Sequence, residues 1–264
     1  MIEVWGQPTK IHTQMTSSRW SNQEFRKAYL SLVSETAQKM CAPFWWSVEQ
    51  PTGTVARILH NGTICYVNTG SRCIGVTANH VYQKYLDDVE LYGDAAIECQ
   101  FGDSTIYPEQ RVIARSEKWD ISTFDIPEVF VSAGVRDPKT HHHAVQWPPD
   151  RALSAEVVMY GGYPGVMREE KGHIAELPFQ WLAGRVSDVS EQNIVLEPKF
   201  ETSQWLGSEK NVDPGGWSGG PVFRSVDGLI ERLELVGYIY EFPLGEAVLA
   251  RHADVVMADG NLTP

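Results

Sequence analysis

Three short stretches of the sequence carry the residue types that nucleophilic catalysis needs, and the most informative of them surrounds Ser218. This serine lies in the glycine-dense segment Asp213-Pro-Gly-Gly-Trp-Ser-Gly-Gly-Pro-Val222. A serine hydroxyl is a poor nucleophile until an adjacent base takes its proton, and acyl transfer also needs N–H groups aimed at the developing oxyanion. Glycines allow the backbone N–H groups of Gly216 and Ser218 to converge. The segment therefore predicts a nucleophilic serine beside an oxyanion hole.

Two other stretches supply the base and its carboxylate partner. Gly75-Val-Thr-Ala-Asn-His-Val81 is an apolar strand that ends near His80, and Lys118-Trp-Asp-Ile-Ser-Thr-Phe124 places Asp120 at the start of another strand. Histidine is the most frequent general base, and a carboxylate can hold its ring in the required tautomer. We predict that His80 is the base and that Asp120 orients it. Asp125 is expected to be a solvated strand end instead.

These stretches resemble the motifs of the trypsin-like serine peptidases, which have the chymotrypsin fold. Gly216-Trp-Ser-Gly-Gly-Pro221 is similar to the Gly-x-Ser-Gly-Gly-Pro motif, Thr77-Ala-Asn-His80 to the Thr-Ala-Ala-His motif, and Asp120-Ile-Ser-Thr-Phe124 to the Asp-Ile/Leu-Ala-x-Leu motif. The order His, Asp, Ser is also that of the family. The resemblance covers about residues 50–258. It implies a mainly β serine endopeptidase with two packed antiparallel six-stranded β-barrels.

Two details make the chain more similar to the prokaryotic, high-temperature-requirement type of these peptidases than to the secreted digestive ones, and a third bears on activation. Val81 stands where digestive members have a disulfide-bonded cysteine, and Tyr160-Gly-Gly-Tyr-Pro164 resembles a turn that opens the second barrel of the bacterial proteases. Trp217 stands where digestive members have an aspartate that pairs with a newly cleaved amino terminus. An indole cannot compensate a buried ammonium group, so we expect a protein made without an activation peptide.

The resemblance also implies where a substrate side chain binds, and it leaves open whether the pocket prefers a hydrophobic or a basic side chain. In this family the residue about six before the serine forms the floor of the specificity pocket, which is Val212 here. The wall of the pocket is expected to consist of Tyr240, Glu241 and Phe242. An apolar floor favours a hydrophobic substrate side chain. A shift of one residue would place Asp213 at the floor and favour Lys or Arg.

The elements that position these residues are predicted to be mostly short strands. Ser21 and Glu24 have the spacing of a helix capping box, and the apolar spacing that follows predicts an amphipathic helix over 21–41. Asn61-Gly62 between two apolar runs predicts a two-residue hairpin turn. Strands are expected at 55–59, 63–67, 73–77, 95–101, 111–114, 121–126, 155–160, 181–189, 194–197, 220–223 and 233–242, followed by a closing helix at 245–257.

Two blocks of short strands joined by a connector favour two packed barrels over a βαβ architecture. The connector includes His141-His142-His143 and Pro148-Pro149, which suit neither a strand nor a helix, so the histidines are expected to lie in a mobile linker rather than to bind metal. The predicted parts are an N-terminal arm and helix (1–50), a first barrel with His80 and Asp120 (51–135), a linker (136–151), and a second barrel with Ser218 and the closing helix (152–264).

Composition argues against several other classes of protein. The 264 residues include 22 Lys or Arg and 34 Asp or Glu, a net charge of −12, which repels nucleic acid and anionic membranes. No apolar run approaches the roughly 20 residues that cross a bilayer, and residues 1–10 lack the apolar core of a secretory signal. We expect a cytoplasmic protein with no cofactor and no metal that acts on polypeptides, and the sequence does not indicate its oligomeric state. Buried free thiols are expected at Cys41, Cys65, Cys73 and Cys99.

Two other functions fit part of the pattern. Gly216-Trp-Ser-Gly-Gly220 matches the G-x-S-x-G motif of α/β-hydrolases, but those enzymes place Ser before Asp and His, and only His252 follows Ser218. A catalytically inactive protein of the trypsin fold that binds polypeptide partners is the stronger alternative, because matching motifs do not prove an assembled site. Labelling of Ser218 by a fluorophosphonate probe distinguishes an active from an inactive protein.

Overall fold

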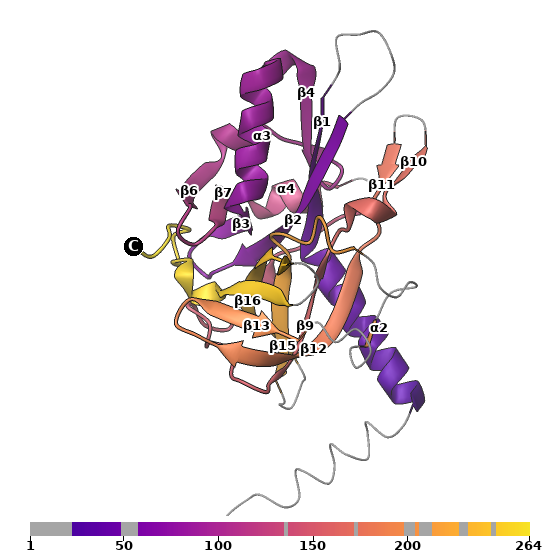
Figure 1. The fold of residues 1–264 in the computed structure, drawn as a ribbon, viewed down its shortest axis with the longest axis vertical. Coiled ribbons are helices and arrows are strands. Elements are labelled where there is room, and N and C mark those ends of the chain that lie inside the picture. Colours follow the sequence, from indigo (N-terminus) through magenta and orange to yellow (C-terminus); the bar gives the residue numbers. More distant parts are fainter. Residues whose placement is uncertain are drawn as a thin grey trace, which may run out of the picture.

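The computed structural model describes residues 23–48, 58–134, 137–171, 174–197, 204–205, 213–226, 232–243 and 247–264. This part of the chain is mainly β, with few helices and with two large sheets that occupy the upper and lower halves of Figure 1. Val212 lies outside the described residues.

The lower sheet closes into a six-stranded antiparallel barrel. Its strands follow the order β13-β17-β16-β15-β9-β12, and β12 pairs again with β13 to complete the ring. The short β14 (Gln204–Trp205) adds to β12, while β10 (Glu169–Lys171) and β11 (Ile174–Glu176) form a separate pair. The barrel strands are β9 (Val157–Gly162), β12 (Gln180–Val189), β13 (Asn193–Leu196), β15 (Pro221–Val226), β16 (Arg232–Glu241) and β17 (Val248–His252).

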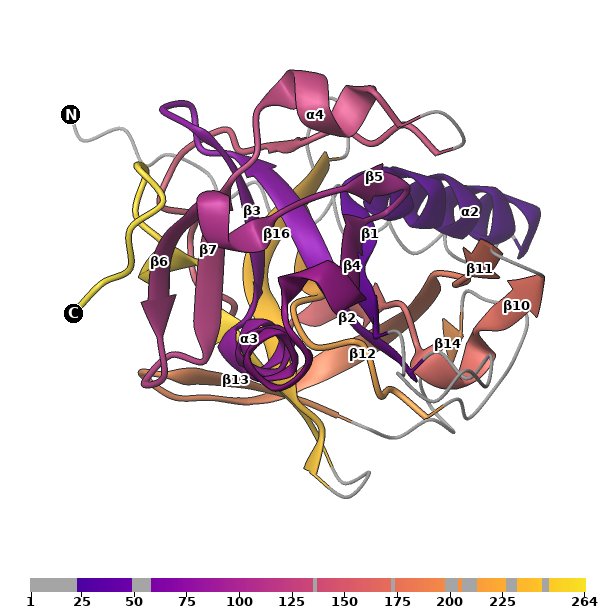
Figure 2. The same cartoon turned by 90° about the horizontal axis from the view of Figure 1, so that it is seen from above.

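The upper sheet is not shown to close within the described residues, so the first barrel that the sequence predicts is not confirmed. Its order is β5-β4-β1-β2-β3-β7-β6 with β8 parallel to β2, and no pairing among the described strands joins the ends of this order. A helix, α3 (Asn79–Tyr92), packs against β1, β3, β4 and β7 of this sheet, as Figure 2 shows with the helix end-on. The strands are β1 (Cys41–Val48), β2 (Ile58–Asn68), β3 (Cys73–Ala78), β4 (Ile97–Phe101), β5 (Ser104–Thr105), β6 (Val112–Ser116), β7 (Ile121–Asp125) and β8 (His142–His143).

The predicted hairpin at Asn61-Gly62 is wrong. Both residues lie in the middle of β2, where they pair with Trp45 and Phe44 of β1, a strand that the sequence analysis did not expect. Gly62 is needed there for space rather than for a turn, because a Cβ atom would lie 2.6 Å from a methyl group of Val81 in α3. Helix packing therefore explains the glycine.

The predicted closing helix at 245–257 is also wrong. The segment contains β17 followed by a 3₁₀ turn, Ala253–Val255. In β17 the residues Val248, Ala250 and His252 are buried while those between them are only partly covered. That alternation has the period of a strand, and the strand bridges β13 and β16 within the barrel.

Helices are few in the described chain. α2 (Gln23–Lys39) lies within the stretch predicted as helical and extends away from the sheets in Figure 1. α3 was not expected, and α4 (Glu128–Ser132) is a single short helix. None of the helices in the described ranges combines the length and the apolar character needed to cross a membrane.

Two of the three histidines in the run, His141 and His142, are packed rather than exposed, so the prediction of a mobile linker is wrong for them. His141 and His142 are buried, and β8 pairs with β2. His142 packs edge-on against Phe223 of the barrel, with ring centroids 5.2 Å apart. Burial, followed by the charge of His143, lowers the pKa of His142 to about 4.

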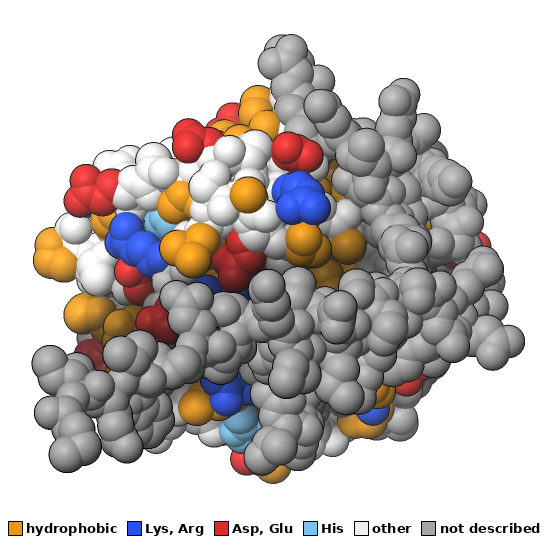
Figure 3. Space-filling view, turned by 90° about the horizontal axis from the view of Figure 1, so that it is seen from below, with side chains coloured by type: hydrophobic (Ala, Val, Ile, Leu, Met, Phe, Trp, Pro, Cys, Tyr) orange, Lys and Arg blue, Asp and Glu red, His pale blue; other side chains and the backbone are white. Residues whose placement is uncertain are grey.

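Three apolar clusters hold these parts together. One fills the barrel, one lies between the upper sheet and α3, and the third joins the two halves through residues such as Val76 and Phe223. Three of the four free cysteines are buried within these clusters, as expected, and Cys73 is partly exposed. Acidic, basic and hydrophobic side chains are interspersed on the described surface seen in Figure 3. A mainly β chain with one closed barrel is compatible with a chymotrypsin-like fold.

Candidate active site

His80 and Asp120 are joined by two hydrogen bonds. The Nδ1 atom of His80 lies 2.7 Å from Asp120 Oδ2, and the His80 backbone N–H donates to Asp120 Oδ1 at 2.8 Å. Because an ionised carboxylate can only accept hydrogen bonds, the ring proton is assigned to Nδ1 and Nε2 is left as an acceptor. The imidazole is half exposed, at 51%. The structure thus brings the predicted base and its orienting carboxylate together.

The backbone around this pair explains its geometry. His80 lies in the first turn of α3, and the cap residue Ala78 has no side chain that could bond the free N–H groups there. Asp120 takes this role, because its carboxylate accepts from His80 and its carbonyl accepts from the Asn79 N–H at 3.0 Å. It does so with a positive φ of 49°, a conformation that Asp tolerates better than most residues. The start of α3 and the start of β7 therefore hold each other in place.

The nucleophile segment, residues 213–222 around the predicted nucleophile Ser218, contains glycines that have no room for a side chain. Gly216 and Gly219 have φ values of 103° and 90°, which favour glycine. A Cβ atom on Gly219 would lie 2.0 Å from the Thr63 carbonyl oxygen, and one on Gly216 would lie 2.3 Å from Asn61 Nδ2. Two glycines that the sequence placed around the nucleophile are thus required by close packing on β2.

Thr63 of β2 holds this segment from the opposite half of the molecule. Its Oγ1 donates to the Gly216 carbonyl at 2.8 Å and accepts from the Tyr163 N–H at 3.1 Å. Its own N–H donates to the Ser218 carbonyl at 2.9 Å. Thr63 is completely buried, and nothing in the sequence around it distinguished it from any other strand threonine. Sequence reasoning missed this residue for that reason.

The two predicted oxyanion donors are not engaged elsewhere. Neither the Gly216 N–H nor the Ser218 N–H donates to an acceptor within the part of the chain that the structure describes. A preorganised N–H group that has no other acceptor can stabilise negative charge without first breaking a bond. Trp217 between them is buried in the barrel cluster, edge-on to Tyr160 with centroids 6.3 Å apart.

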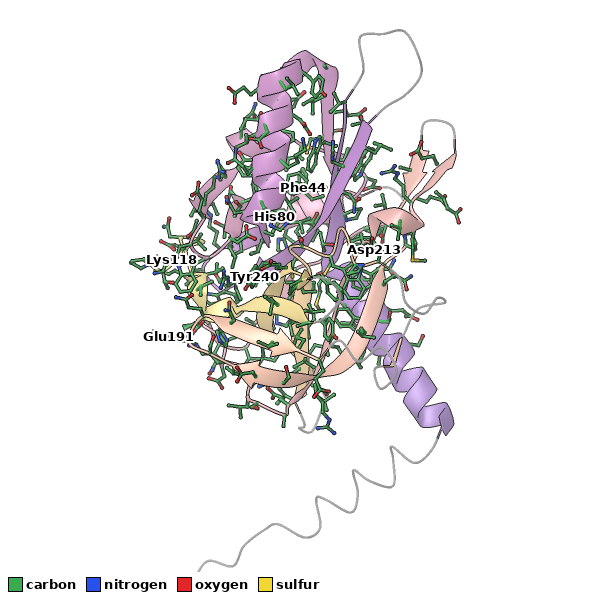
Figure 4. All side chains as sticks on the ribbon, viewed as in Figure 1. Phe44, His80, Lys118, Glu191, Asp213 and Tyr240 are labelled. Carbon is green, nitrogen blue, oxygen red and sulfur yellow. The ribbon has the colours of Figure 1, made fainter. Side chains whose placement is uncertain are left out.

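One cavity of about 460 Å³ contains the predicted catalytic residues. It is lined by His80, Asp120, Asp213, Pro214, Gly215, Ser218, Tyr240, Glu241 and Phe242. Figure 4 shows His80 and Tyr240 at the junction of the two halves. Within the described residues no hydrogen bond joins Ser218 to His80; such bonds are often long without substrate and tighten in the complex.

The predicted wall residues Tyr240, Glu241 and Phe242 all line this cavity. The Tyr240 ring lies against Arg251, whose guanidinium carbon is 3.9 Å from the ring centroid, and its hydroxyl donates to Asn193 at 3.2 Å. Burial raises the pKa of Tyr240, and the Arg251 charge opposes that rise. Tyr240 therefore presents a neutral, fixed ring to the cavity that His80 and Asp120 also line.

Asp125, the alternative to Asp120 as the orienting carboxylate, and Asp213, the alternative to Val212 as the pocket floor, have partners of their own. Asp125 pairs with Arg72 at 2.7 Å at the far end of β7 and is well exposed, as predicted for a solvated strand end. Asp213 lines the cavity and accepts a hydrogen bond from the Gly215 N–H at 2.9 Å. Its carboxylate therefore stabilises the turn that leads into the nucleophile segment.

Two further features bear on the chemistry. A second cavity, of about 520 Å³, lies beside α2 and the histidine run and contains none of the three predicted catalytic residues. No cluster of three or more His, Cys, Asp or Glu side chains suited to a metal ion occurs among the described residues.

Comparisons with known proteins do not establish the function of this protein. No protein-family model and no curated protein matches the sequence. A solved structure described under "Aromatic interactions drive the coupled folding and binding of the intrinsically disordered Sesbania mosaic virus VPg protein" is similar to this chain, with 14% sequence identity and a TM-score of 0.42. The similarity covers 83% of this chain and 94% of that chain. At that TM-score the similarity supports no conclusion about activity.

Proposed function

We propose that this protein is a serine endopeptidase that hydrolyses peptide bonds through an acyl-enzyme on Ser218. One observation carries the proposal: His80 Nδ1 lies 2.7 Å from Asp120 Oδ2, and this pair lines the same cavity as Ser218. A hydroxyl, an oriented base and unengaged N–H groups are the components that acyl transfer requires. The motif order and the closed barrel are compatible with a trypsin-like peptidase.

The acylation step uses all of these groups. Ser218 Oγ attacks the carbonyl carbon of the scissile peptide, and its proton passes to His80 Nε2. The carbonyl oxygen becomes an oxyanion, which the N–H groups of Gly216 and Ser218 stabilise. Asp120 stabilises the imidazolium that forms. His80 then returns the proton to the leaving nitrogen, so that the C–N bond breaks and an ester remains on Ser218.

Deacylation repeats the sequence with water as the nucleophile. His80 takes a proton from water, the resulting oxygen attacks the ester carbon, and the same two N–H groups stabilise the second oxyanion. The Ser218 oxygen leaves with the proton from His80, which releases the carboxylic acid and restores the starting state. A polypeptide is thus the substrate, and no cofactor is consumed.

A catalytically inactive protein that binds polypeptides is the second candidate. The observation that favours it is the missing Ser218–His80 hydrogen bond within the described residues. An inactive protein would keep the cavity and bind peptides there, but Ser218 would have no more nucleophilicity than an ordinary serine hydroxyl.

Labelling by a fluorophosphonate probe tests the two candidates directly. The probe forms a covalent bond only with an activated serine, so the proposed enzyme should be labelled at Ser218 and the Ser218→Ala variant should not. Replacement of His80 by Ala should also abolish labelling, because the base is then absent. A folded wild-type protein that binds peptides but is not labelled would establish the inactive alternative.

Peptide-library cleavage would then define the substrate preference. A hydrophobic residue before the cleaved bond is expected if Val212 forms the pocket floor, whereas Lys or Arg is expected if Asp213 does. Mass-spectrometric mapping of the cleavage sites, with Ser218→Ala as control, separates these outcomes.

A further inference from the structure

The direction of an oxyanion donor is set by the peptide group to which it belongs. In a trans peptide the C=O and N–H bonds point in opposite directions within one plane. An N–H group can therefore be aimed from behind, by a hydrogen bond to the carbonyl of the preceding residue. For the Ser218 donor that carbonyl belongs to Trp217, and for the Gly216 donor it belongs to Gly215.

The two donors differ in what lies behind them. The Trp217 carbonyl accepts from the Gly220 N–H at 2.7 Å, so the Ser218 donor is oriented within its own turn. The Gly215 carbonyl accepts from the Gly165 N–H, also at 2.7 Å. The Gly216 donor is consequently oriented by a segment that lies some way before it in the sequence.

Asn61 of β2 holds that segment. Its Nδ2 donates to the Tyr163 carbonyl at 2.8 Å, two residues before Gly165. Its amide also fills the space between the two glycines: a Cβ atom on Gly165 would lie 2.5 Å from Asn61 Oδ1, and one on Gly216 would lie 2.3 Å from Asn61 Nδ2. The Asn61 amide, the Gly165 backbone and the Gly216 backbone are packed as one unit.

We propose that Asn61 is a positioning residue for catalysis, which aims the Gly216 N–H at the oxyanion through the Tyr163–Gly165 segment and the Gly215 carbonyl. This proposal rests on the serine peptidase function proposed above. Asn61 does not touch the reacting atoms and instead limits the rotation of the Gly215–Gly216 peptide. A residue of the upper sheet thereby controls a donor that belongs to the lower barrel.

The effect of losing Asn61 should appear in the chemical step. Removing one oxyanion donor typically lowers kcat by about 10²–10³-fold. We expect Asn61→Ala and Asn61→Asp to lower kcat by about 10²-fold at little change in KM, since binding of the ground state does not depend on this N–H. The Asp variant keeps the side-chain size while it removes the donor to the Tyr163 carbonyl.

Asn68→Ala is a matched control. Asn68 is the last residue of the same strand and also uses its side chain for one backbone hydrogen bond, which it accepts from the Gly70 N–H at 2.8 Å. The loss of this exposed bond should lower thermal stability no more than the loss at Asn61 and leave kcat unchanged. The thermal midpoint of every variant should be measured so that folding and catalysis are separated.

Inhibition by a peptide aldehyde supplies a readout that a purely structural role would not move. The aldehyde forms a tetrahedral adduct with Ser218 whose oxygen needs the oxyanion hole, whereas a product peptide occupies the cavity without forming one. The aldehyde inhibition constant should rise about 10²-fold in the Asn61 variants, in parallel with the loss of kcat. The affinity for the product peptide should stay within about twofold, because ground-state binding is unaffected.

The outcomes distinguish this inference from the proposed function. Folded Asn61 variants that cleave and bind the aldehyde like wild type, while Ser218→Ala is inactive, would overturn the role of Asn61 and leave the peptidase intact. An equal loss of aldehyde and product affinity would also overturn it, since the cavity as a whole would then be disturbed. A wild-type protein that neither cleaves peptides nor reacts at Ser218 would overturn both proposals.

Discussion

His80 and Asp120, in the upper half of the molecule, are connected by a side-chain hydrogen bond of 2.7 Å, whereas Ser218 lies in a segment whose own contribution to its hydrogen bonds with other elements is mostly backbone. The first arrangement depends on which side chains are present. The second depends on where a side chain is absent, at Gly216 and Gly219, and on carbonyls that Thr63 contacts. Substitutions should therefore damage the two regions in different ways: a lost functional group in the upper half, and lost space or a displaced backbone in the lower half.

Removing a functional group of either region should have the largest effect. Ser218→Ala and His80→Ala should each lower kcat by about 10⁶-fold, and the double variant little further, because the two residues act as one unit. Peptide cleavage measured under single-turnover conditions provides the comparison. Additive losses, or near wild-type cleavage by Ser218→Ala, would show that the two regions do not act together.

Adding one carbon atom to the nucleophile segment should come next. In Gly219→Ala the new Cβ would meet the Thr63 carbonyl at 2.0 Å while φ is 90°, so the segment must shift. A displacement of about 1 Å can cost on the order of 10²-fold in rate, which we expect in kcat, along with a lower thermal midpoint.

Gly70→Ala is the control for that substitution. Gly70 has a similar φ of 86° but nothing within 4 Å of the added carbon, so only the conformational cost of about 1–2 kcal/mol remains. Its kcat should match wild type. Equal activity losses in the two variants would mean that strain, rather than the space beside Ser218, explains the result.

A smaller loss is expected when the contact between the regions is weakened. Thr63→Val keeps the side-chain shape but leaves the Gly216 carbonyl without its donor and the Tyr163 N–H without its acceptor. Each such unsatisfied group costs about 1–3 kcal/mol when it is buried. We expect kcat to fall about tenfold, a value that corresponds to about 1.4 kcal/mol.

Thr123→Val tests whether this loss is specific to the site. Thr123 is also completely buried, and its Oγ1 donates to the Gly260 carbonyl at 2.6 Å, away from Ser218. Urea unfolding should show a loss of stability for both valine variants, while only Thr63→Val should lose activity. A reduced kcat in Thr123→Val would remove the special role of the Thr63 contact.

The smallest effect at neutral pH is expected for His142, where the two halves meet, and it concerns the stability against unfolding. Its pKa is about 4 in the folded protein and near the ordinary value of 6.5 when unfolded, so the unfolded chain takes up the proton first. Its contribution to stability is full above about pH 6.5 and is lost as pH falls toward 4, by up to roughly 3 kcal/mol.

Urea unfolding at pH 7.5 and 4.5 should show a smaller loss of stability for His142→Leu than for wild type. The exposed neighbour His143→Leu should retain most of the wild-type slope, and equal slopes for all three proteins would contradict the burial argument.

Much of the strand content followed from local pattern. The apolar runs at 73–77, 121–126 and 181–189 lie within or across β3, β7 and β12. Such strands can be predicted from neighbouring residues, because their side chains either alternate between apolar and polar or form a continuous apolar run. The order of His80, Asp120 and Ser218 and the glycines around Ser218 could likewise be recognised in the sequence, since each motif is contiguous.

The identity of the chemical groups and most of the strands therefore follow from the sequence alone. Contacts between distant segments determine which strands close a ring, why Gly62 is a glycine, and that Asn61 and Thr63 contact the segment around Ser218. They also make residues 248–252 a strand, β17, instead of part of the expected closing helix, since the neighbouring strands β13 and β16 supply its hydrogen-bond partners. These features depend on contacts between residues far apart in the chain, and a local pattern contains no information about which distant backbone will occupy the adjacent space.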